Sequence, residues 1–170
     1  MNTNGISRRV DELGRIVIPK EFRKNLRIKS GDCLEIYTTN GEIVLKKQDI
    51  VADSITSLNK TLGIISKTIN NDILITDTDK FLVSFGSEKY EALINKEISE
   101  GLYSSLEKRT KLTSLNSKIP EFENTNYIIN PIIVNGDTIG SIILIGADEL
   151  TPDQNIIDVI NNLFINHIEI

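Results

Sequence analysis

The first 48 residues constrain the fold most, because they predict a small β-rich unit that closes before it can build a large core. Alternating apolar residues and turn residues predict short strands at residues 6–10, 15–18, 33–38 and 42–47. Residues 11–14 supply the first turn, and Asn40-Gly41 is a strong hairpin turn. One or two helical turns are expected after Ile18, opened by Pro19 and ended by Ser30-Gly31-Asp32. A unit of about this size has a marginal core without disulfides, metal or a partner chain.

The usual covalent and metal stabilisers of small units are missing from the sequence. Cys33 is the single cysteine and His167 the single histidine, so we expect no intrachain disulfide and no metal site. Cys33 lies in an alternating segment and is predicted to be a small buried apolar residue. A second chain is the remaining stabiliser, and residues 1–48 are therefore expected to dimerise.

Charge is segregated along the chain, whose net charge is -5. Residues 1–48 carry +4 and residues 49–170 carry -9. Eight basic residues stand between positions 8 and 29 against three acidic ones: Arg8, Arg9, Arg15, Lys20, Arg23, Lys24, Arg27 and Lys29, with Asp11, Glu12 and Glu21. Solvated surface charge would explain an isolated run. Here the basic residues fall on two expected strands and a helix, so one folded surface can collect them, which favours binding of DNA or RNA.

The same segment carries a family resemblance. The run GISRRVDELGRIVIPKEFRK at residues 5–24, followed by LEI at 34–36 and IVLKK at 43–47, resembles the AbrB-type swapped-hairpin DNA-binding domain. The resemblance implies that two chains interleave their hairpins into one barrel-like dimer that binds double-stranded, AT-rich, deformable DNA. It implies leading DNA contacts from Arg8, Arg15, Arg23 and Lys24, with Arg9 and Lys20 as additional contacts. Lys24 stands where arginine is common in the family.

An apolar stripe follows the basic unit and predicts a helix of about 20 residues within 49–70. Its members recur every three or four residues: Val51, Ile55, Leu58, Leu62, Ile65 and Ile69. Such a stripe is typical both of a helix that packs on its own domain and of helices that pair between subunits. Gly63 lies within the stripe and weakens the helix, so a close-packing role is an alternative there.

Residues 71–170 predict a separate α+β domain. We expect strands at 73–76, 81–85, 127–134 and 138–145, the last two joined by a hairpin around Asn135-Gly136-Asp137. Residues 87–108 predict a helix with a break at Gly101, and residues 110–126 predict a loop with at most short elements. Thr151-Pro152-Asp153 is expected to cap a final helix that reaches Phe164 or beyond.

The end of this domain, from Tyr127 to Ile168, is similar to the end of a GAF domain. An AbrB-like head with a GAF-like domain resembles the sporulation regulators of the AbrB family, which implies a regulator of gene expression in developing spores, tetrameric through its C-terminal domains. GAF-like folds often bind small molecules, and four aromatic residues are candidates to line such a space: Phe81, Phe85, Tyr90 and Tyr103. The alternative is that they are core residues. The sequence identifies neither a ligand nor a cofactor.

Other functions find less support in the sequence. It offers no paired nucleophile and base and no glycine-rich phosphate loop, so catalytic residues are not expected. The alternative is an antitoxin-type or assembly protein whose C-terminal part binds a protein partner. Antitoxins can share the head, but the tails that wrap their toxins are typically short and disordered, unlike the apolar C-terminal half. A pure assembly protein with an idle DNA surface is a further alternative. No apolar run approaches the ~20 residues that span a bilayer, and no secretory leader opens the chain, so we expect no membrane contact and a cytoplasmic location.

Overall fold

The computed structural model describes residues 5–26, 28, 30, 34–47, 50–147 and 150–168. The predictions for Arg27, Lys29 and Gly31 to Cys33 lie outside the described residues. The chain divides into two compact units, residues 1–48 and 49–170. Across the described ranges, no helix combines the length and the apolar character required to cross a membrane.

The first unit contains one antiparallel hairpin, formed by β1 (Leu34–Thr39) and β2 (Glu42–Lys47). Thr39 pairs with Glu42 across a two-residue loop, so Asn40 and Gly41 are the central turn residues. Both have positive φ, 51° and 78°, as a type I′ turn requires. The predicted Asn-Gly hairpin is confirmed.

The two N-terminal strands predicted at residues 6–10 and 15–18 are wrong for the single chain. Residues 5–11 and 15–19 carry no helix or strand, although residues 12–14 form the predicted turn. A strand requires a neighbouring strand to take its backbone hydrogen bonds. Among the described residues of the first unit, the ladder pairs join β1 only to β2. The alternation of apolar residues identified an extended segment but not a partner for it.

The second unit is built on a five-stranded antiparallel sheet with the order β4-β3-β7-β6-β5. Its strands are β3 (Asn71–Thr76), β4 (Phe81–Phe85), β5 (Leu112–Thr113), β6 (Tyr127–Val134) and β7 (Asp137–Gly146). The four longer strands confirm the predicted ones within about two residues. Asn135 and Gly136, at φ 51° and 85°, turn β6 into β7, which confirms the second hairpin.

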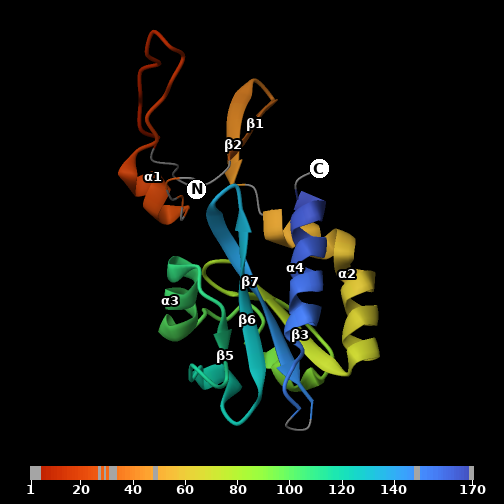
Figure 1. The fold of residues 1–170 in the computed structure, drawn as a ribbon. Coiled ribbons are helices and arrows are strands. Elements are labelled where there is room, and N and C mark those ends of the chain that lie inside the picture. Colours follow the sequence, from red (N-terminus) through yellow and green to blue (C-terminus); the bar gives the residue numbers. More distant parts are fainter. Residues whose placement is uncertain are drawn as a thin grey trace. The chain divides into compact units, whose positions relative to one another are not determined.

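Helices cover both faces of this sheet (Figure 1). On one face lie α2 (Ile50–Ile69) and α4 (Gln154–Ile168), whose buried side chains join those of Ile73, Ile142 and Leu144 in one core. On the other face lie α3 (Glu100–Lys108) and two short 3₁₀ helices, η1 (Glu88–Leu93) and η2 (Pro120–Phe122). Their core contains Leu74, Ile143 and Ile145. A strand buried on both faces has no polar alternation, which explains the apolar run of residues 142–145.

The apolar stripe of α2 packs on the helix's own unit. Val51, Leu58 and Leu62 are buried in the core that α2 shares with α4, and Ile55, Ile65 and Ile69 are packed against that core. Of the two alternatives for the stripe, the structure therefore supports packing within the domain. Gly63 leaves room for a methyl group, because a Cβ there would lie 3.8 Å from Phe85 Cδ1, so no close approach requires glycine.

The helix predicted over residues 87–108 is two helices, and its break does not lie at Gly101. η1 ends at Leu93 and α3 begins at Glu100, with an isolated bridge between Lys80 and Glu97 in the interval. Asn95 sits there at φ 66°, a left-handed conformation that asparagine tolerates better than most residues. Gly101 lies inside α3, where a Cβ would approach Ile119 Cδ1 to 3.1 Å, so packing rather than chain reversal favours glycine.

Two glycines of this unit give a matched prediction. Gly140 of β7 lies against the Thr76 backbone, and a Cβ there would collide with the Thr76 carbonyl oxygen. We expect Gly140→Ala to lower the free energy of unfolding by more than about 2 kcal/mol, because backbone must move. Gly63→Ala should raise it by up to about 1 kcal/mol through helix propensity. Urea denaturation of the full chain measures both, and a Gly140→Ala chain as stable as wild type would contradict the packing described.

Candidate nucleic-acid interface

The basic segment of the first unit is organised by one tight turn between Asp11 and Arg15. The Asp11 amide N–H donates to the Arg15 carbonyl at 3.0 Å, and the Gly14 N–H donates to the Asp11 carbonyl at 3.0 Å. The Asp11 side chain adds to this, because its Oδ1 accepts from the N–H of Leu13 at 3.0 Å and of Arg15 at 2.8 Å. Gly14 adopts φ 77°, which glycine reaches without steric cost.

Asp11 also binds the side chain of Arg15. Its Oδ2 accepts a hydrogen bond from Arg15 Nε at 2.8 Å, while 71% of the Arg15 side chain remains exposed. The Arg15 N–H and guanidinium, followed by the Leu13 N–H, lower the pKa of Asp11 below its ordinary value of 3.8. Asp11 is therefore ionised at neutral pH, and its bonds are lost only when the pH falls below that range.

By charge alone, Asp11 is only an acidic residue that offsets the basic cluster. The spacing of the residues indicates a further role for Asp11. An aspartate at the start of a turn that contains glycine often accepts hydrogen bonds from backbone N–H groups two to four residues later. An arginine at the fourth position can then fold back onto the same carboxylate. Asp11-x-x-Gly14-Arg15 has this arrangement.

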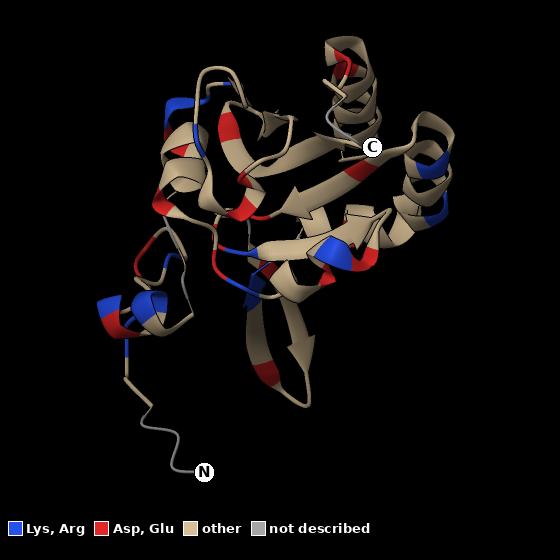
Figure 2. Ribbon diagram, turned by 90° about the horizontal axis from the view of Figure 1, so that it is seen from below, with Lys and Arg blue, Asp and Glu red and all other residues tan. Residues whose placement is uncertain are grey.

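The short helix α1 (Lys20–Asn25) gathers three further basic residues on one face. Lys20, Arg23 and Lys24 are three and four positions apart, which places them on neighbouring turns of the same side. The helix begins one residue later than predicted, because Pro19 precedes it at φ -56° instead of opening it. Figure 2 shows Lys and Arg positions concentrated on this helix, whereas charges of both signs are scattered over the second unit.

All six predicted DNA-contacting residues are exposed: Arg8, Arg9, Arg15, Lys20, Arg23 and Lys24. Of these, Arg15 belongs to the turn and three residues belong to α1. Arg8 and Arg9 precede the turn in a stretch without regular structure, where Arg8 Nη1 donates to the Ser7 carbonyl at 3.2 Å. No described residue of the first unit other than Pro19 is buried.

Large apolar side chains are also exposed on the first unit. Ten of the fifteen exposed large apolar residues of the described chain lie there, although it has fewer than a third of the residues. They are Ile6, Val10, Leu13, Ile16, Val17, Leu26, Ile36, Tyr37, Ile43 and Leu45. Val17 and Leu13 are each 74% exposed. A soluble domain rarely leaves so much apolar surface uncovered unless another surface packs against it.

The four aromatic residues proposed for a ligand space lie in different places. Phe81 and Tyr90 are buried in the core beneath α3, where both rings make edge contacts with Phe122 at centroid distances of 6.2 and 6.1 Å. Phe85 packs against the core beneath α2 and α4. Tyr103 is 38% exposed on α3. The structure thus brings Phe81 and Tyr90 together around Phe122 and separates the other two from them.

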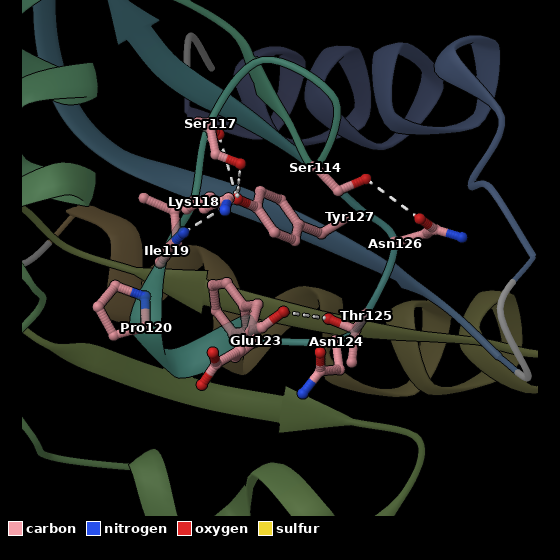
Figure 3. Close-up of a pocket in the computed structure, with 11 residues that line it drawn as sticks. Ser114, Ser117, Lys118, Ile119, Pro120, Glu123, Asn124, Thr125, Asn126 and Tyr127 are labelled. Atoms are coloured by element: carbon pink, nitrogen blue, oxygen red, sulfur yellow. Dashed lines mark hydrogen bonds between the residues drawn. The ribbon is translucent and has the colours of Figure 1, made fainter.

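A pocket of about 870 Å³ opens elsewhere in the second unit, along the loop between β5 and β6. All of its lining residues belong to residues 114–127, and the four predicted aromatics are not among them. Figure 3 shows the Tyr127 hydroxyl pointing to Ser117 and Ile119. That hydroxyl donates to the Ser117 carbonyl at 3.0 Å and accepts from the Ile119 N–H at 3.1 Å. These bonds hold the loop, so the buried Tyr127 side chain serves the fold.

Two family models match the chain. The family described as "Stage V sporulation protein T C-terminal, transcription factor" matches residues 58–161, which is more than half of the chain. The family described as "Antidote-toxin recognition MazE, bacterial antitoxin" matches residues 7–52, which is the head and the start of α2.

Two curated relatives from Bacillus subtilis (strain 168) cover different lengths. Stage V sporulation protein T is 35% identical over 156 residues, which span 88% of this chain and 87% of that protein. Transition state regulatory protein AbrB is 55% identical over 47 residues, which span 28% of this chain and 49% of that protein. The first similarity runs through both units, and the second is confined to the head.

Solved structures resemble this chain in fold over about 70% of its length. A GAF domain/HD domain protein from Geobacter sulfurreducens has a TM-score of 0.51 at 16% identity, covering 70% of this chain and 90% of that one. A type II free methionine-R-sulfoxide reductase from Thermoplasma acidophilum has a TM-score of 0.54 at 12% identity, covering 71% and 95%. At such identities the likeness concerns the fold alone.

Three findings point to the same family: the transcription-factor model that matches most of the second unit, the relative that spans both units, and the GAF-like fold. The chain therefore belongs to the family of stage V sporulation protein T, whose members are transcription factors, and it joins an AbrB-like DNA-binding head to a GAF-like domain.

Proposed function

We propose that this transcription factor binds double-stranded DNA as a homodimer of residues 1–48, through Arg8, Arg9, Arg15, Lys20, Arg23 and Lys24. The observation that carries the proposal is the surface of the first unit, where all six basic side chains are exposed and ten large apolar ones are uncovered. The basic groups supply phosphate contacts, and the apolar groups supply a surface that pairs two chains.

The energetics of the apolar surface favour pairing. Burying one large apolar side chain contributes about 1.5 to 3 kcal/mol. The ten residues of each chain are 39% to 74% exposed, so covering the surface that is still open represents on the order of 10 kcal/mol per chain. This is comparable with the roughly 4 to 15 kcal/mol that association costs in lost freedom. Val10, Ile16 and Val17 flank the turn at residues 11–15, so the surface that pairs the chains lies beside Arg15, one of the residues that contact DNA.

The six exposed lysine and arginine side chains of the first unit suit contacts with phosphate. We propose that the dimer prefers AT-rich, deformable DNA, since phosphate contacts carry no sequence information and shape supplies the preference. The relatedness to stage V sporulation protein T supports a role in sporulation gene expression, in the cytoplasm, with tetramers formed through the second domain. Binding of a small ligand by Phe81, Phe85, Tyr90 and Tyr103 stays a prediction.

An antitoxin is the second candidate, and the head alone favours it through its match to the antitoxin family. The second unit weighs against this role. It has its own sheet with cores on both faces, whereas a toxin-wrapping tail folds only on its partner.

Substitution of Val17 by aspartate tests the proposed dimer. Val17→Asp places a charge on the proposed pairing surface, so we expect the native mass of the full chain to halve and its duplex affinity to fall at least tenfold. Leu115→Asp is the matched control, because Leu115 is 90% exposed on a loop of the second unit and should tolerate the change. Native mass spectrometry and fluorescence anisotropy make the two measurements. A Val17→Asp chain with wild-type mass and affinity would rule out this surface.

A further inference from the structure

We propose that Asp11 is a positioning residue for DNA binding: one carboxylate oxygen closes the turn, and the other holds Arg15 so that the outer edge of its guanidinium faces DNA. This inference rests on the proposed function, because it assumes that Arg15 contacts DNA. By charge alone an acidic residue opposes binding to DNA. The proposal gives Asp11 the opposite effect, because its hydrogen bonds promote binding.

The two oxygens of Asp11 have separate tasks. Oδ1 accepts both backbone bonds, from the N–H groups of Leu13 and Arg15 at 3.0 and 2.8 Å. Oδ2 accepts from Arg15 Nε at 2.8 Å and, among the described residues, from no other donor. The carboxylate therefore fixes the backbone of the turn with one atom and the direction of the arginine side chain with the other.

The contact leaves the rest of the guanidinium available. An arginine side chain has five N–H donors, and the bond to Asp11 occupies the single one on Nε. The two Nη groups form an outer edge that can bind a phosphate or a guanine with two parallel bonds. With 71% of the Arg15 side chain exposed, this edge is open to solvent.

Holding the side chain in advance favours binding. A free arginine loses considerable rotamer freedom when it binds a phosphate, and an arginine already fixed at Nε loses less. The charge state agrees with this role, because hydrogen bonds from Arg15 and Leu13 lower the pKa of Asp11 and keep it an acceptor at neutral pH. Glu12, its neighbour in the same turn, is also exposed but has no such bond among those described, which makes it a matched control.

The chemistry of asparagine separates the two tasks. In Asp11→Asn the retained Oδ1 can still accept both backbone bonds, while Nδ2 replaces Oδ2 and cannot accept from Arg15 Nε. The same substitution removes one negative charge per chain, which by electrostatics alone strengthens binding to DNA and steepens its salt dependence. The positioning role therefore predicts that Asp11→Asn lowers the affinity for DNA, whereas charge alone predicts that it raises the affinity.

The test measures duplex affinity of the full chain by fluorescence anisotropy for Asp11→Asn and Glu12→Gln, each in wild-type and Arg15→Ala backgrounds. We expect Asp11→Asn to weaken binding about tenfold, or about 1.4 kcal/mol over the two turns of a dimer, and Glu12→Gln to leave it equal or tighter. In the Arg15→Ala background, Asp11→Asn should no longer weaken binding, because its effect passes through Arg15.

Each other result has a definite meaning. If Asp11→Asn binds as tightly as Glu12→Gln, the positioning role is overturned while the proposed function stands. If Asp11→Asn weakens binding equally in both backgrounds, Asp11 acts through the fold of the turn and not through Arg15, which also overturns the inference. If the wild-type chain binds no duplex, the proposed function itself fails. Far-ultraviolet circular dichroism of Asp11→Asn confirms that the variant is folded.

Discussion

Simultaneous substitution of Arg15 and Arg23 by alanine should weaken duplex binding about a thousandfold. In a dimer the double substitution removes four exposed cationic side chains, two from the turns and two from the α1 helices. If each contributes about 1 kcal/mol as a charge-assisted contact, the loss is about 4 kcal/mol, close to three factors of ten. The slope of log affinity against log salt should fall by about 3 to 4.

The control is a pair of substitutions that removes two positive charges per chain from the second unit. Lys60 and Lys67 are both exposed on α2, and their substitution by alanine changes the net charge by the same amount in a helix that accepts alanine well. We expect this pair to change the affinity by less than about threefold. Equal losses for the two pairs would mean that only the total charge of the chain matters, and the assignment of Arg15 and Arg23 would be wrong.

The second large effect concerns stability. Phe122 is 1% exposed and contacts the rings of Phe81, Tyr90 and Tyr127, so Phe122→Ala opens a cavity at the centre of the core beneath α3. We expect a loss of about 3 to 5 kcal/mol in the free energy of unfolding, and a fall in Tm of roughly 10 to 20 °C. Differential scanning calorimetry of the full chain measures this change.

Phe85→Ala is the matched control for the same residue type in a less buried position. Phe85 lies at the edge of the core beneath α2 and α4, so we expect a loss of about 1 to 2 kcal/mol. If Phe85→Ala cost as much as Phe122→Ala, the aromatic cluster would not be the tightly packed centre of its core.

Local chemistry made part of the fold predictable. Asn40-Gly41 and Asn135-Gly136 indicate type I′ turns directly, and each fixes the register of two strands. The three-and-four spacing of α2 gave both its length and its buried side. These features depend on residues that are neighbours in sequence, so the sequence alone contains the information.

Features that depend on distant residues were not predictable in the same way. Apolar alternation at residues 6–10 indicates an extended segment but does not say which strand pairs with it, and none of the described strands does. Phe122 lies in a segment that is polar and irregular in sequence, yet it unites aromatic residues from three other elements. The left-handed turn at Asn95 splits one expected helix into two, because asparagine permits that conformation without requiring it.

Some residues of the candidate site were likewise predictable from the sequence, and others were not. The basic residues of the head were identified from charge and resemblance, and the structure finds all six exposed. The role of Asp11 depended on geometry, since a count of charges records an aspartate only as a reduction of the positive field. The aromatic residues of the second domain were selected by type alone, and type does not say on which face of a sheet a ring lies.

Salt titration of duplex binding by the full wild-type chain tests the central claim most directly. A DNA-binding dimer with its basic residues on the turns and α1 helices predicts tight binding at low salt. It also predicts a slope of log affinity against log salt of about -0.9 for every phosphate contacted, with up to twelve such contacts from the six residues of each chain. Absence of duplex binding at low salt, or affinity that does not change with salt, would contradict the account.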